Sequence, residues 1–200
     1  SQIISSVENT ILALFDKLSF QHSYDKEYLK NIHYYNGWKT NKAYKINKKV
    51  IIPLNAVDWY DKEFKYTHKT GETLADIEKV LNYINSKEVE SIDLENTLRE
   101  ALNNGQNKNI DCKHFTVTFY KKGTCHIVFK DDDLLLKFNI FGSQRKGWLP
   151  PGYGKKNYSD MEKEEQEIID EFQGKKEYEQ VYNNPRLYSY NSQELLLLGN

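Results

Sequence analysis

The chain has 200 residues, of which 38% are hydrophobic and 14% aromatic. This aromatic content excludes an intrinsically disordered chain, and the length fits one large domain or a compact domain with a smaller appendage. The 28 Lys and Arg residues against 29 Asp and Glu residues give a net charge of -1, which excludes a protein that attracts anions with its whole surface, so an anionic partner must meet a local patch.

Apolar residues repeat every three or four positions from Ile3 to Phe20, which predicts an amphipathic helix. The segment 25–35 is expected to continue helical. The runs 50–52 and 56–66 predict two strands around a turn at 53–55. The first part of the chain therefore predicts helices followed by a strand pair.

Two further helices should cover the sheet. Thr73 can cap the first, whose apolar residues between Leu74 and Ile84 share one face. The second should begin at Ser91 and end near Gly105, because glycine commonly ends helices.

The clearest local signal is a β-hairpin over residues 115–130. With a three-residue loop at 121–123 and Gly123 in the left-handed region, Phe119 faces Cys125 and one face becomes wholly apolar. A four-residue loop would divide the apolar residues between two faces, so the hydrophobic pattern selects the first register. The opposite face then carries Thr116, Thr118, His126 and Lys130.

The last part of the chain predicts another helix, a loop and an acidic helix. Asp131–Asp133 can cap a helix that Gly142 ends. After a loop rich in Gly, Pro and basic residues, Ser159 should open an acidic helix, and the tail beyond Gly174 lacks strong periodicity. The acidic helix should bury Met161, Ile168, Ile169 and Phe172.

The fold class that follows is α+β, with a small antiparallel sheet, including the 115–130 hairpin, packed against several helices. We expect a core domain over 1–141, with the basic loop, acidic helix and irregular tail of 142–200 packed on it.

Two basic segments, 38–49 and 145–156, are candidates for contact with nucleic acid. The first has five lysines without an acid, and its aromatic residues could stack on exposed bases. The second is a loop that two prolines restrict and that Trp148 and Tyr153 can anchor, so that its cations are held outward. Alternatively, the first is a solvated loop and the second is stapled to the core for structural reasons. The candidate residues are Trp38, Lys39, Lys42, Tyr44, Lys45, Lys48, Lys49, Arg145, Lys146, Lys155 and Lys156.

Catalytic chemistry has weaker support. His126, Lys130 and Asp133 are the candidates for an enzyme site, but Cys125 and His126 point to opposite faces of a strand and cannot form a nucleophile–base pair. The sole Pro-Pro sequence, Pro150-Pro151, has the wrong neighbours for an amino-methyltransferase loop, so the chain is not a methyltransferase catalytic domain.

Neither a cofactor nor a metal is expected. The five histidines lack close metal-ligand spacing, and Cys112 and Cys125 are too few for a four-thiolate zinc site or a disulfide framework. No stretch approaches the roughly 18 apolar residues of a membrane helix, and the N-terminus lacks a signal-peptide pattern. We expect a soluble, cytoplasmic protein without a membrane contact.

Three segments in order resemble an uncharacterised bacterial and phage domain family that is often fused C-terminally to SAM-dependent DNA methyltransferases. The strongest segment, from Tyr120 to Lys130, is similar to the family pattern aromatic-Lys-Asn-Gly-Asn-x-His-Leu-x-Phe-Lys, and Asp133-Leu134 and Lys137-Phe138-Asn139 follow it as in the family. The second segment consists of Asn41 together with residues 47–52. The third segment is 76–80. Asn47 and Thr124 depart from the family's Gly and Asn.

The resemblance implies an association with DNA modification or phage–bacterium conflict and carries no catalytic residues. We therefore expect an accessory or recognition module that contacts DNA weakly, or RNA. The alternatives are an enzyme acting on DNA or nucleotides, and a phage-encoded inhibitor that binds a protein partner through the acidic helix 160–171. The sequence leaves the oligomeric state open.

Overall fold

The computed structural model describes residues 2–18, 45–85, 91–147 and 149–188. Within these residues, four strands form one antiparallel sheet in the order β1-β4-β3-β2. The fold is therefore α+β, as the sequence predicts. The strands are β1 (Lys49–Pro53), β2 (Ile110–Asp111), β3 (Phe115–Tyr120) and β4 (Thr124–Phe129).

The hairpin of β3 and β4 has the predicted register. Phe119 pairs with Cys125 and Phe115 with Phe129, and Gly123 has a φ of 91° in the turn. The edge strand β1 adds to β4 so that Val50 and Ile52 join the same apolar face. This face is buried because every second residue of each strand is apolar.

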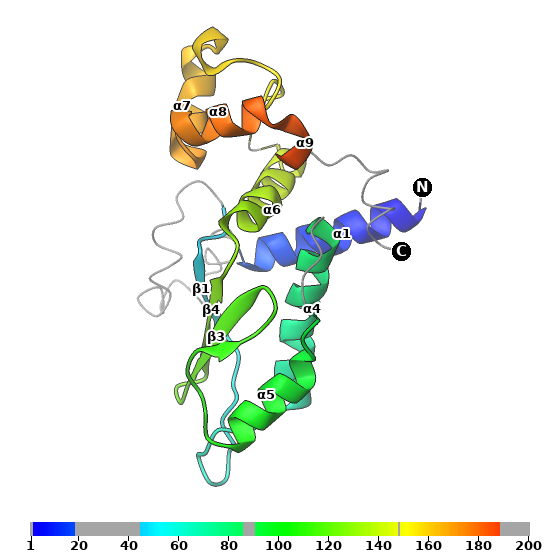
Figure 1. Cartoon of the computed structure of the whole chain (residues 1–200), viewed down its shortest axis with the longest axis vertical. Coiled ribbons are helices and arrows are strands. Elements are labelled where there is room, and N and C mark those ends of the chain that lie inside the picture. Colours follow the sequence, from blue (N-terminus) through cyan, green and yellow to red (C-terminus); the bar gives the residue numbers. More distant parts are fainter. Residues whose placement is uncertain (1, 19–44, 86–90, 148, 189–200) are drawn as a thin grey trace.

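Helices cover the apolar face of the sheet (Figure 1). They are α1 (Gln2–Leu18), α4 (His68–Ile84) and α5 (Leu94–Asn103). Ile11, Phe15 and Leu18 of α1 are buried in this core, which confirms the amphipathic pattern at these positions. The predicted helix over 25–35 lies outside the described residues.

Helix α6 (Asp132–Arg145) links the core to the C-terminal helices. The Asp131 carboxylate accepts the backbone N–H groups of Asp133 and Leu134, so the predicted cap is confirmed. Gly142, however, does not end the helix. It lies inside α6 and is buried, and a Cβ there would lie 2.4 Å from the Phe15 ring, so this glycine permits the close approach of α1 and α6.

The C-terminal part forms a second apolar cluster around Tyr153, Phe172 and Tyr178. Its elements are a 3-10 turn (Tyr158–Asp160), α7 (Lys163–Phe172), α8 (Lys175–Asn183) and α9 (Pro185–Tyr188). The acidic helix thus begins later than the predicted Ser159, because Glu162 and Glu165 form its capping box. Ile168 is 40% exposed rather than buried. The sequence pattern did not predict the two helices α8 and α9.

Three predictions in the first half of the chain are wrong. The segment 56–66 is a loop with one bridge between Val57 and Phe64, because the Asp58 carboxylate accepts the N–H groups of Tyr60 and Asp61 and turns the chain. Helix α4 begins at His68 because the Thr67 hydroxyl, not Thr73, accepts the N–H of Thr70. Helix α5 begins at Leu94 because Asp93 caps it.

Candidate nucleic-acid interface

The first basic segment lies only partly within the described residues. Trp38, Lys39, Lys42 and Tyr44 fall outside them. Lys45, Lys48 and Lys49 lead into β1 and have three different surroundings, so they do not act as one patch.

Lys45 holds the core to the C-terminal helices. Its ammonium group donates to the Phe172 carbonyl at the end of α7, at 2.5 Å, and lies 5.8 Å from the Phe172 ring. Burial lowers the pKa of Lys45, and the Glu177 carboxylate partly offsets that effect. This contact is typical of a cation at the C-terminal end of a helix and gives Lys45 a structural role.

Asn139 of α6 fixes the backbone next to Lys45. Its Oδ1 accepts the Ile46 N–H at 2.7 Å, and its Nδ2 donates to the Ile46 carbonyl at 2.9 Å. A cavity of about 300 Å³ lies here. Two lysines and two acids line it, with several polar and apolar side chains: Lys45, Lys48, Asp132, Glu177, Ile46, Asn47, Leu135, Leu136, Asn139, Phe172 and Gln173. Its lining charges balance, so the cavity does not select an anion.

Lys48 and Lys49 differ in their pairing. Lys48 lies 2.8 Å from Asp132. Lys49 is exposed at the start of β1, where it pairs with Val128 and therefore lies on the face of the sheet opposite the core.

His126 is at the centre of that opposite face. It pairs with Thr118 on one side and with Ile51 on the other, so it points away from Ile127 and Phe129 as predicted. Its ring centroid lies 4.3 Å from that of Tyr120. Ile51 is buried, whereas Lys49 and Lys122 are exposed.

Two lysines from separate segments border His126. Lys49 lies diagonally across the β1–β4 pair, and Lys122 comes from the hairpin turn. Partial burial, together with smaller contributions from the charges of Lys49 and Lys122, lowers the pKa of His126 to about 4. The imidazole is therefore neutral at pH 7. We define Lys49, Tyr120, Lys122 and His126 as the His126 patch.

The three candidate catalytic residues have separate neighbours. Lys130 forms an ion pair with Asp111 and donates to the Cys112 carbonyl at 2.5 Å. Asp133 accepts from the Tyr188 hydroxyl at 3.2 Å, whereas His126 lies against Tyr120. The described contacts do not bring the three into one site.

The second basic segment is anchored as expected at Tyr153, which is buried, whereas Trp148 lies outside the described residues. Its cations are not all held outward, because three contact acids of the same chain. Arg145 lies 3.5 Å from Glu8, Lys146 2.6 Å from Asp16 and Lys156 3.0 Å from Glu165. Lys155 is exposed. These pairs reduce the positive charge of the loop.

Sequence reasoning missed two members of the His126 patch as functional candidates. Tyr120 and Lys122 belong to the hairpin whose register it predicts, so the signal was present: Tyr120 alternates onto the His126 face and Lys122 occupies the turn. It also missed the exposed pair Trp59 and Tyr60, because it placed them inside a strand.

Among the described residues, no three His, Cys, Asp or Glu side chains are grouped so that they could hold a metal ion. The same residues contain no helix that is long and apolar enough to cross a membrane. Burial raises the pKa of Cys112 to about 12 and also raises that of Cys125, so both are protonated core residues at neutral pH.

The model of one protein family, Domain of unknown function (DUF4942), matches residues 1–148. The chain belongs to the DUF4942 family. The DUF4942 region includes the sheet, the whole His126 patch and α6, whereas α7, α8 and α9 follow it. No curated protein and no solved structure matches the chain.

Proposed function

We propose that this chain is a nucleic-acid-contacting accessory or recognition module, and that it contacts phosphates through the His126 patch. The observation that carries the proposal is that Lys49, diagonally across the β1–β4 pair, and Lys122, in the hairpin turn 73 positions further along the sequence, both lie close enough to His126 for their charges to act on its ring. Positive groups gathered on one face are what phosphate contact requires in a chain without net positive charge.

The neutral His126 ring and Tyr120 complement these lysines. The Nδ1 atom of His126 is buried, so the neutral imidazole can contact a ligand through no more than its other nitrogen, Nε2. The aromatic rings offer flat surfaces to bases or sugars. Because few cations take part, binding should be weak, and its salt dependence should be shallow, since each phosphate contact adds only about 0.7 to 0.9 to the slope of log affinity against log salt. The resemblance to domains fused to DNA methyltransferases supports a role in DNA modification or in phage–host conflict in the cytoplasm.

The test is fluorescence anisotropy with a fluorescein-labelled DNA of about 20 nucleotides, as a single strand and as a duplex, at low salt. The double variant Lys49→Ala/Lys122→Ala should weaken binding at least about tenfold, because two phosphate contacts are lost. The matched control is Lys79→Ala/Lys176→Ala, which removes the same charge from exposed positions on α4 and α8.

The control should keep its affinity within about twofold. Equal losses in both variants would mean that only total charge matters, and would overturn the assignment to the His126 patch. A wild-type protein that binds neither form of DNA at low salt would overturn the proposal itself.

A further inference from the structure

The loop 54–66 exposes two adjacent aromatic side chains. Trp59 is 83% exposed and Tyr60 is 91% exposed. Ile168, the other exposed large hydrophobic residue among those described, is on α7 at the opposite end of the molecule (Figure 1). Large rings that contribute nothing to a core are typical of a binding site.

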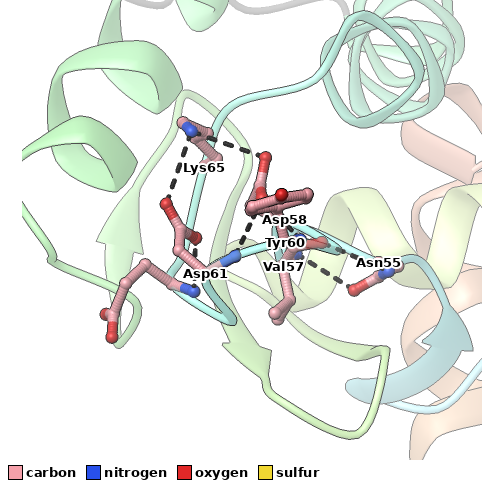
Figure 2. A network of polar contacts seen from close by, with 7 residues as sticks. Asn55, Val57, Asp58, Tyr60, Asp61 and Lys65 are labelled. Carbon is pink, nitrogen blue, oxygen red and sulfur yellow. Dashed lines mark hydrogen bonds and ion pairs between the residues drawn. The ribbon is translucent and has the colours of Figure 1, made fainter.

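The loop holds these rings on a well-defined backbone (Figure 2). The Asp58 carboxylate accepts the N–H groups of Tyr60 and Asp61, at 2.8 and 3.2 Å, and the Asn55 side chain accepts the Val57 N–H at 3.0 Å. Lys65 contacts both Asp58 and Asp61, at 3.4 and 3.6 Å. Less backbone entropy is therefore lost when the rings bind a partner.

The base of the loop is attached to the core. Phe64 and Tyr66 pack against it, and the Arg99 guanidinium lies 4.5 Å from the centroid of the Tyr66 ring. The anchoring side chains are thus separate from the exposed ones, so Trp59 and Tyr60 can be changed without removing core contacts.

The charges around the loop nearly balance, and one cation lies directly over an exposed ring. Lys62 lies over the Trp59 ring at 5.3 Å, and Lys121 of the hairpin turn lies 5.7 Å from the Phe64 ring. All three acids of the loop have basic partners, because Asp58 and Asp61 contact Lys65 and Glu63 lies 3.9 Å from Lys121, which reduces their repulsion of a phosphate.

The loop also continues the His126 patch. The Leu54 N–H donates to the Gly123 carbonyl at 3.1 Å, so the loop lies beside the hairpin turn. Lys122 in that turn lies close enough to His126 for its charge to lower the pKa of the imidazole. A strand that contacts the His126 patch can therefore reach Trp59 and Tyr60 by passing the turn.

We propose that Trp59 and Tyr60 stack on unpaired nucleobases of a single-stranded nucleic acid whose phosphates pass Lys62 and the hairpin turn. This inference rests on the proposed function and specifies its ligand. Two rings by themselves supply only part of the roughly 800 Å² that each partner of a stable protein interface buries, whereas they suffice for one or two stacked bases.

The experiment compares a labelled 20-nucleotide oligothymidine with a labelled duplex of the same length, using the full chain. Wild-type protein should bind the single strand more tightly than the duplex. Trp59→Ala and Tyr60→Ala should each weaken single-strand binding by roughly 5- to 100-fold, as expected for loss of one stacked base, and should change duplex binding by less than about twofold. Trp59→Phe, which keeps a ring, is the matched control and should lose less than Trp59→Ala.

Three results would overturn the inference. If wild-type protein binds DNA and both Trp59→Ala and Tyr60→Ala bind the single strand with wild-type affinity, the rings do not stack on bases. The proposed function would still stand in that case. If wild-type protein binds neither DNA, the proposed function and the inference both fail. If sedimentation shows self-association that Trp59→Ala abolishes, the rings belong to a protein interface.

Discussion

Gly142 is buried in α6, where the helix passes against Phe15 of α1. We expect Gly142→Ala to lower the free energy of unfolding by about 1–3 kcal/mol, although alanine favours helices, because the new methyl group would overlap the Phe15 ring. Urea unfolding measures the change. The matched control is Gly152→Ala, whose Cβ would meet Lys156 at an ordinary 3.6 Å, and an equal loss in both variants would contradict the packing explanation.

Gly123 is required for a different reason, since its φ is 91°. Gly123→Val should destabilise by roughly 1 kcal/mol or more, because a β-branched residue resists the left-handed region. Thermal or urea unfolding checks this. Unchanged stability would indicate that the turn can adopt another conformation.

His114 and His126 make stability depend on pH. Burial, with smaller contributions from neighbouring lysines, lowers the pKa of each to about 4, below the usual 6.5. As the pH falls, the unfolded chain therefore binds protons at these histidines before the folded chain does. The stability that depends on the two histidines being neutral is complete above about pH 6.5 and is lost as the pH falls towards 4. We expect the melting temperature to fall between pH 7 and pH 5, with a smaller fall in His114→Gln/His126→Gln. The exposed His68 provides the control His68→Gln, and an equal fall in all three proteins would contradict this account.

At the scale of elements, α6 positions the segment before β1. Asn139→Ala should lower the free energy of unfolding by about 2–4 kcal/mol, because the Ile46 N–H and carbonyl would lose their buried partner. Chemical denaturation measures the loss. Asn183→Ala, at an exposed position on α8, should stay within about 0.5 kcal/mol of wild type, and similar losses in both variants would exclude a special role for Asn139.

The sequence predicted some elements and not others for physical reasons. The hairpin register was predictable because a shift by one residue would bury Thr118 and expose Phe119, so the pattern allows one answer. The loop 56–66 was not predictable, because one side chain, that of Asp58, overrides the strand propensity of the aromatic residues in the loop. Helix α8 was missed because it buries only Tyr178 and Val181, and so carries little periodicity.

At the scale of the whole molecule, charge pairing limits what a sequence can say about a site. Arg145 and Lys146 contact Glu8 and Asp16, which lie more than 100 residues away in the chain, so only the tertiary structure shows that they are paired. Conversely, Lys49 joins Lys122 near His126 only because the sheet places β1 next to β4. Counting lysines along the sequence identified Lys49 and missed its neighbour.

The salt dependence of single-strand binding tests the contact of the His126 patch with phosphates most directly. Each phosphate contact with a single strand contributes about 0.7 to the slope of log affinity against log salt, so Lys49→Ala/Lys122→Ala should reduce the slope by about 1.4 relative to wild type. Titrations of the labelled oligothymidine at several salt concentrations give both slopes. Identical slopes, or no binding by the wild-type protein at the lowest salt concentration, would contradict the claim.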